Sequence, residues 1–278
     1  MSRLWRDQLC VGLYPDQVVL ARLARGITNP IADSKYQPAS VQSGAPLWKA
    51  ALEKLDGMLA ETATKHAVLR LVLSSKLVRY LALPAHGGSL SSEEQVAYVR
   101  GAYHEVYGEA AEHWNIQFHD AAPGEATIAA AIDAELLDRL EEIATQHRIR
   151  LASVKPQLMV VFNRLRRQLV RANGYLVLAE PGRLLLGSLH KGRWQNLRTL
   201  PVDHNWLSQL TYWLERESWL DAEESGLARE VLICAPEYGD LSLPVVKGWG
   251  IRRIDDKLRT PRMAAGNHRY AMALGAMV

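Results

Sequence analysis

The sequence has few cysteines and no long apolar run. Cys10 and Cys234 are the only cysteines among 278 residues, and both lie in apolar, strand-like runs. Two such thiols do not make a disulfide framework, so we expect them to be buried and free. No run approaches the roughly 18 to 20 apolar residues of a membrane-spanning helix. Charged residues near the N-terminus interrupt the region where a signal peptide needs an apolar core, so we expect a cytosolic protein.

The common sequence signatures of catalysis are also absent. The chain contains no G-x-S-x-G elbow, no Walker A sequence and no G-x-G-x-x-G sequence. A formal net charge of +3 is too small to imply nucleic-acid binding by itself. His104, His113 and His119 lie among acidic residues, but their spacing matches no metal-ligand pattern, and we expect surface side chains there.

Two stretches of the chain share one pattern. Residues 9–26 (LCVGLYPDQVVLARLARG) and 175–192 (YLVLAEPGRLLLGSLHKG) align without a gap at an offset of 166 residues. Val11 then corresponds to Val177, and Pro15 corresponds to Pro181. Each stretch has an apolar strand, a turn containing proline and a second apolar strand. The sequence therefore predicts a duplicated β-hairpin.

Each hairpin is followed by a helix and then by a strand. Apolar residues have helical spacing over 46–66 and 206–220, and apolar strands are predicted at 67–74 and 230–235. Continuous apolar strands are usually covered on both faces, as in α/β layers. We therefore predict an α/β fold with two lobes, built from a duplicated hairpin–helix–strand unit.

The first copy carries an additional α+β piece. It opens with the extended run VRYLALP, continues with a capping box at Ser91 and a helix, and contains two strands and a helix capped by Asp133. We predict a first lobe at 1–75, an inserted subdomain at 76–150, a connecting strand and helix at 151–172, and a second lobe at 173–278. A small-residue helix is predicted at 267–277, and a polar surface loop at 27–44.

The order of these segments resembles the actin-like ATPase superfamily, whose two ribonuclease-H-like lobes enclose a nucleotide cleft. The best match is to the PilM-like actin-like proteins of type IV pilus assembly, and the GspL-like cytoplasmic domains of type II secretion are close behind. The resemblance rests on the two hairpins, on VRYLALP with the helix SSEEQVAYVRGAYHEVYG, on TIAAAIDAELLDRLEEIATQHRIRLASVKPQLMVVFNRLRR and on the terminal AMALG. It covers nearly the whole chain.

The two hairpin turns depart from what hydrolysis needs in that fold. Active relatives carry a metal-linked Asp and then a Gly in the first hairpin, and the resemblance places Gly12 and Tyr14 at these positions. A tyrosine ring is bulky where phosphate must approach the backbone. Asp16 lies four residues beyond Gly12, which is too far along the turn for the acid position. An alignment slip of that size is not expected, because a slip of one residue already flips every strand side chain to the other face of the sheet. In the second hairpin Glu180 is near the acid position, but Pro181 lacks a backbone N–H.

The expected adenosine loop also departs from the pattern. Paired glycines should follow the 230–235 strand, and the chain has Ala235 and Pro236 there. We therefore predict no catalytic residue, no metal and no bound cofactor. The alternative is an active ATPase or kinase that binds Mg-ATP between the lobes, with Asp16 or Glu180 as the metal-linked acid. A nucleic-acid processor on a ribonuclease-H-like core is a third interpretation, against which Gly12 and Leu178 count.

The resemblance implies a non-catalytic scaffold of a pilus or secretion assembly platform. Such a protein would bind the cytoplasmic tail of a bitopic inner-membrane protein, in a groove between the first lobe and the inserted subdomain. It would associate peripherally with the inner membrane through its partners, which could include the assembly ATPase but no nucleic acid. Candidate groove residues are Val78, Tyr80 and Leu83; the other interpretation is that they are plain core.

Charged and aromatic side chains suggest further surfaces. Arginines at 164, 166, 167 and 171, and cations between 247 and 262, predict a solvated face or a docking site for an acidic partner or anionic lipid. The acidic pairs at 223–224 and 255–256 are expected to be solvated. Four tryptophans that neighbour charged residues are candidate interface anchors: Trp48, Trp114, Trp219 and Trp249.

Overall fold

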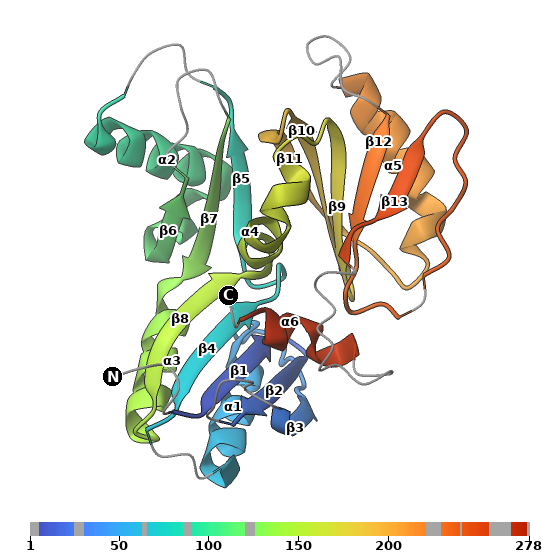
Figure 1. Ribbon diagram of the computed structural model, residues 1–278. Coiled ribbons are helices and arrows are strands. Elements are labelled where there is room, and N and C mark those ends of the chain that lie inside the picture. The colour runs from blue at the N-terminus through green and yellow to red at the C-terminus, as the bar shows by residue number, and fades with distance from the viewer. Residues whose placement is uncertain are drawn as a thin grey trace. The chain divides into compact units, whose positions relative to one another are not determined.

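The computed structural model describes residues 6–24, 31–62, 66–85, 90–119, 126–220, 229–239, 241–255 and 268–276. Its contacts divide the chain into two compact units. Unit 1 comprises Met1–Arg79, Ile132–Asn163 and Leu258–Val278, and unit 2 comprises Tyr80–Ala131 and Arg164–Lys257. Each unit contains a five-stranded sheet, and unit 2 also contains most of a three-stranded sheet (Figure 1).

The sheet of unit 1 has the order β3-β2-β1-β4-β8. The five strands are β1 (Gln8–Leu13), β2 (Gln17–Leu23), β3 (Ile31–Pro38), β4 (Val68–Leu73) and β8 (Arg150–Pro156). The hairpin strands β1, β2 and β3 pair antiparallel, whereas β4 and β8 continue the sheet in parallel. Every residue of β1 after Gln8 is buried, as expected for a strand with both faces covered.

Helices cover this sheet. α1 (Lys49–Thr62) contacts β2, β3 and α3 (Ala134–Gln146). The short helix α6 (Ala271–Gly275), preceded by a 3₁₀ turn at His268–Tyr270, contacts β1, β2 and β4 (Figure 1). Its five residues are all buried, which small side chains allow because they bring the helix close to the strands. The predicted small-residue helix is thus present, although 267 and 277 lie outside the described residues.

The sheet of unit 2 repeats the same plan with the order β11-β10-β9-β12-β13. Its strands are β9 (Gly174–Glu180), β10 (Arg183–His190), β11 (Arg193–Pro201), β12 (Glu230–Cys234) and β13 (Gly250–Arg253). α5 (Trp206–Leu220) packs Trp206, Leu210, Trp213 and Leu214 against the sheet. α4 (Gln157–Leu169) crosses the division between the units, which lies after Asn163.

The strand registers confirm the duplication. Leu13 pairs with Val18 in the first hairpin, and the residues that align with them, Ala179 and Leu184, pair in the second. In each sheet the first hairpin strand also pairs in parallel with the strand that follows the helix. The gap-free alignment read from the sequence is therefore the actual correspondence of the two hairpins.

The additional piece forms the three-stranded sheet β5-β7-β6 with one helix. Its elements are β5 (Arg79–Leu83), α2 (Ser92–Tyr107), a 3₁₀ helix (Gly108–His113), β6 (Trp114–Phe118) and β7 (Thr127–Asp133). The predicted capping box is present, because Ser91 Oγ accepts from the Glu94 N–H and the Glu94 carboxylate accepts from the Ser91 N–H. α2 buries Val99 and Tyr103 against this sheet.

One expectation about the elements needs correction. Residues 31–38, expected in a surface loop, form the edge strand β3, whose residues alternate between half-buried and exposed. Its polar side chains hid the strand, because only the backbone pairing with β2 requires it. The inserted subdomain stays a prediction at 76–150; by contacts, Tyr80–Ala131 group with unit 2 and Ile132–Asn163 group with unit 1. α3 lies in that stretch and contacts α1 and β8.

Candidate functional site

The first hairpin packs closely against α6 at Gly12, which lies in β1. A Cβ built on Gly12 would lie 3.0 Å from Met272 Cε and 3.4 Å from the backbone N of Ala273, both in α6. An aspartate at this position would therefore point into the buried contact between β1 and α6. This is the position at which the resemblance expects a metal-linked carboxylate.

Tyr14 fills the interior behind the turn of the same hairpin. Its side chain is fully buried and belongs to the apolar cluster that contains Val19, Val72 and the α6 residues. Its backbone N–H donates to the Gln17 carbonyl at 3.0 Å, which closes the turn. The backbone amide that could have faced a phosphate is therefore occupied within the hairpin itself.

Asp16 lies at the outside of the turn. Its carboxylate is 3.6 Å from Lys76 Nζ, and its side chain is 56% exposed. The backbone of Asp16 accepts from the Ala39 N–H at 2.8 Å, which fixes the turn to the end of β3. Asp16 is thus an exposed acid paired with a lysine beside the turn.

The second hairpin closes with a tight turn. Glu180 pairs with Arg183, so Pro181 and Gly182 form a two-residue connection. Gly182 has φ +78°, and a proline followed by such a glycine is typical of a type II turn. Glu180 is 1% exposed. Its carboxylate thus lies inside unit 2, and Pro181 supplies no N–H to a ligand.

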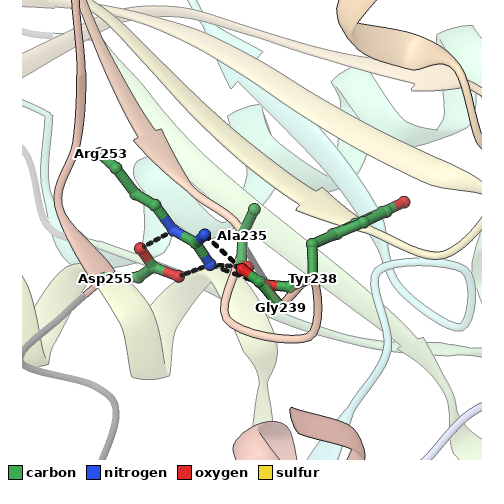
Figure 2. A network of polar contacts seen from close by, with 5 residues as sticks. All are labelled: Ala235, Tyr238, Gly239, Arg253 and Asp255. Carbon is green, nitrogen blue, oxygen red and sulfur yellow. Dashed lines mark hydrogen bonds and ion pairs between the residues drawn. The ribbon is translucent and has the colours of Figure 1, made fainter. Parts of the chain in front are cut away.

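A buried arginine organises the loop after β12. Arg253 donates from Nε and Nη2 to both carboxylate oxygens of Asp255, at 2.5 and 2.8 Å. Its remaining bonds run to three backbone carbonyls of the loop, those of Ala235 (2.8 Å), Tyr238 (2.6 Å) and Gly239 (2.6 Å). Figure 2 shows the guanidinium enclosed between the carboxylate and these carbonyls. This is the loop at which the resemblance expects adenosine.

The arginine network corrects two expectations. Asp255 was expected to be a solvated acid, but it is fully buried. Arg253 was expected on a basic surface, but its side chain is only 13% exposed. The sequence did not reveal the buried pair of Arg253 and Asp255, because an arginine two positions before an acid is a common pattern on protein surfaces. The loop carbonyls that bury it are 14 to 18 residues away in the chain.

Aromatic rings complete the surroundings of this loop. Tyr238 lies edge-on to Trp206, with ring centroids 5.9 Å apart. Burial first, and then the charges of Glu237 and Glu180, raise the pKa of Tyr238 to about 12 against a lowering effect of the Trp206 side chain. The phenol therefore stays protonated at neutral pH. The loop after β12 is held by packing and by internal polar contacts.

The three candidate groove residues are buried. Val78, Tyr80 and Leu83 are 3%, 6% and 5% exposed, and Leu83 belongs to the apolar cluster beneath α2. Their side chains occupy the interior in this structure. β5, which carries Tyr80 and Leu83, is an edge strand of the β5-β7-β6 sheet.

The remaining candidates differ in exposure. His104, His113 and His119 are exposed, and among the described residues no group of three or more His, Cys, Asp or Glu side chains could hold a metal ion. Of the four tryptophans, Trp48 is buried and donates to Asp133 at 2.8 Å. Trp219 is 81% exposed. The acidic pair at 223–224 lies outside the described residues, as does residue 256.

Comparisons with known proteins identify the fold. A chain of the PilM–PilN type IV pilus biogenesis complex matches with TM-score 0.62 and 14% identity over 97% of both chains. The cytoplasmic domain of EpsL, an inner-membrane component of the Vibrio cholerae type II secretion system, matches with TM-score 0.57 and 12% identity over 98% of this chain and 94% of its own. A Bacteroides thetaiotaomicron protein with an actin-like ATPase fold matches with TM-score 0.53 and 14% identity over 87% of this chain and 86% of its own.

These likenesses show that the chain has the actin-like ATPase fold, as expected from its duplicated hairpins. No protein-family model matches the sequence, and no curated protein matches it. Within the described residues, no helix is both long enough and apolar enough to cross a membrane.

Proposed function

We propose that this protein is a non-catalytic, cytoplasmic scaffold of a type IV pilus or type II secretion-like assembly platform. Its role would be to bind the cytoplasmic tail of an inner-membrane partner, with which it associates peripherally. The observation that carries the proposal is the packing of α6 against Gly12. A side chain at the position of the expected acid would press against Met272 and Ala273, in a fold shared along nearly its whole length with the PilM–PilN and EpsL structures.

The second hairpin and the loop after β12 support the same proposal. Pro181 has no N–H for a phosphate, and the carbonyls of the loop are engaged by Arg253. The contacts at Gly12, the missing N–H at Pro181 and the bonds of Arg253 to the loop carbonyls together support a fold without nucleotide chemistry. The chain keeps the actin-like architecture although its two hairpins and the loop after β12 depart from the nucleotide-binding pattern. Such a fold is suited to binding another protein.

We further propose that the partner's tail binds as an added strand on the outer edge of β5. In the order β5-β7-β6, only one edge of β5 is paired within its sheet. An extended peptide can pair with the other edge through main-chain hydrogen bonds. The buried Val78, Tyr80 and Leu83 would then act by supporting the strand rather than by touching the tail.

Co-purification tests the scaffold role. The tagged protein, isolated from detergent-solubilised membranes of its native host, should bring down a single-span protein of a pilus or secretion system. If only soluble proteins and no envelope component are recovered, the proposal loses its main support.

Cysteine cross-linking tests the binding edge once the tail is identified. Cys10 and Cys234 are both buried, so an introduced cysteine would be the accessible thiol among the described residues. Ala82→Cys on β5 should cross-link to a cysteine in the tail peptide, whereas Gln117→Cys on the opposite edge strand β6 should not. Equal cross-linking at both positions, or cross-linking at Gln117→Cys alone, would place the tail elsewhere.

A further inference from the structure

Residues 143–202 carry an excess of positive charge. This stretch contains eleven Lys and Arg side chains and a single acidic residue, Glu180, although the whole chain has a formal net charge of only +3. Glu180 is 1% exposed. No acidic side chain of this stretch therefore neutralises the cations at the surface, and the rest of the chain carries a net negative charge.

The fold of unit 2 brings part of this charge together. The turn between β10 and β11, Lys191–Gly192, packs against the residues at the end of α4. The Gly192 N–H donates to the Ala172 carbonyl at 2.8 Å, and a Cβ built on Gly192 would lie 2.5 Å from the Val170 carbonyl oxygen. Because the turn and the helix end are in direct contact, the cations that flank them lie close together.

We call this surface the α4 basic patch. It consists of five exposed cations, Arg166, Arg167, Arg171, Lys191 and Arg193. The first four form no ion pair with another described residue. An apolar side chain is exposed next to them: Val170, which precedes Arg171, is 56% exposed. The patch therefore combines uncompensated positive charge with an exposed apolar group.

We propose that the α4 basic patch binds the anionic headgroups of a lipid membrane. Lys and Arg near an anionic leaflet each contribute about 1 kcal/mol of attraction, and an exposed apolar side chain can enter the headgroup region. Arg clusters also bind acidic motifs, but the exposed Val170 beside these cations favours a membrane surface, into which an apolar side chain can insert. Lys191 is held in the turn with φ +51°, a conformation uncommon for a non-glycine residue.

This inference rests on the proposed function only in placing the protein next to a membrane. It adds a second, direct contact to the contact made through the partner's tail. Because the tail is proposed to bind at β5, the two contacts use different elements of the chain and can be lost separately.

Vesicle co-sedimentation of the full chain tests the inference. Vesicles of phosphatidylcholine mixed with phosphatidylglycerol should bind the protein at low salt, and vesicles of phosphatidylcholine alone should not. Raising the salt concentration should weaken the binding, because it screens exposed charges. Arg167→Gln, Arg171→Gln and Lys191→Gln combined should lower the affinity roughly a hundredfold, which corresponds to about fivefold per charge.

A matched variant separates the patch from net charge. Arg100, Arg216 and Lys247 are exposed cations of unit 2 outside the patch. Replacing these three with glutamine removes the same charge and should leave vesicle binding within about threefold of the wild type. Both triple variants change exposed side chains only, and equal thermal unfolding temperatures verify that each is folded.

Three results would overturn the inference. One is equal loss of binding in the two triple variants, and another is binding that does not depend on phosphatidylglycerol. The third is binding to a soluble poly-glutamate peptide but not to vesicles, which would assign the patch to an acidic protein instead. None of these results touches the cross-linking of the tail at β5, so failure here leaves the proposed scaffold role standing.

Discussion

Replacing Arg253 with methionine should lower the free energy of unfolding of unit 2 by about 3–5 kcal/mol, the usual cost of breaking a buried ion pair by removing one partner. Methionine keeps the length of the side chain and removes every donor. Asp255, which is fully buried, would then carry a charge without its cation. The carbonyls of Ala235, Tyr238 and Gly239 would also lose their donor.

The magnitude follows from the contacts. Arg253 makes five short polar contacts, of which two reach the carboxylate and three reach the loop carbonyls, and the two N–H groups of Nη2 are shared among three of the acceptors. Each buried polar group left unsatisfied costs about 1–3 kcal/mol, and a charged one costs more. The costs do not add, because the loop can open locally and admit water. A total of about 3–5 kcal/mol therefore corresponds to loss of the pair with partial rehydration of the loop.

Urea unfolding and hydrogen exchange provide the assay. The neighbouring Arg252 is a matched control, since it pairs with Glu230 at 2.8 Å but both side chains are exposed, by 51% and 38%. Arg252→Met should cost less than about 1 kcal/mol. In Arg253→Met, amides of residues 235–239 should also exchange faster than in the control.

A second substitution tests the cause. If the uncompensated carboxylate dominates, adding Asp255→Leu to Arg253→Met should recover part of the loss, because both charges are then removed. Equal costs for Arg253→Met and Arg252→Met would refute the reasoning, and so would unchanged exchange at residues 235–239. Either result would mean that the network in Figure 2 does not hold the loop.

Three further predictions follow from burial and close packing. Gly12→Asp should not create ATP hydrolysis. It should lower the free energy of unfolding in urea by about 3–5 kcal/mol, because it buries an unpaired charge against α6. The control Gly101→Asp, with nothing within 4 Å of its Cβ, should change that free energy by less than about 1 kcal/mol. Gly192→Ala should lower the free energy of unfolding by about 2–4 kcal/mol, because the φ of Gly192 is +77° and the added Cβ would overlap the backbone at the end of α4. Gly101→Ala, inside a helix, should instead raise it by up to about 1 kcal/mol. Cys10 and Cys234 should react with a maleimide only after denaturation, because burial raises the pKa of Cys10 to about 12 and that of Cys234 well above its usual value; labelling of the native protein at neutral pH would contradict this.

Much of the fold could be predicted because its signals are local. The hairpins show as apolar strands around a turn, and the capping box at Ser91 marks the start of α2 within four residues of sequence. The duplication added a second, independent signal. β3 escaped prediction because an edge strand with alternating polar residues is determined by its pairing with β2 rather than by its own composition.

The candidate site was less predictable because long-range contacts decide it. The sequence shows that Gly12 and Tyr14 depart from the catalytic pattern, but not that α6, some 260 residues later, fills the space beside them. The enclosure of Arg253 by the loop after β12 is likewise a tertiary contact. That β5 is an edge strand emerged only from the sheet order, whereas the sequence had pointed to the side chains of that strand.

Titration calorimetry with Mg-ATP tests most directly whether this fold has lost its nucleotide chemistry. The structure-based account predicts no heat of binding at micromolar nucleotide concentrations and no release of phosphate. Micromolar binding with turnover that disappears in Asp16→Asn would contradict the account, and would identify the exposed acid of the first turn as a catalytic residue.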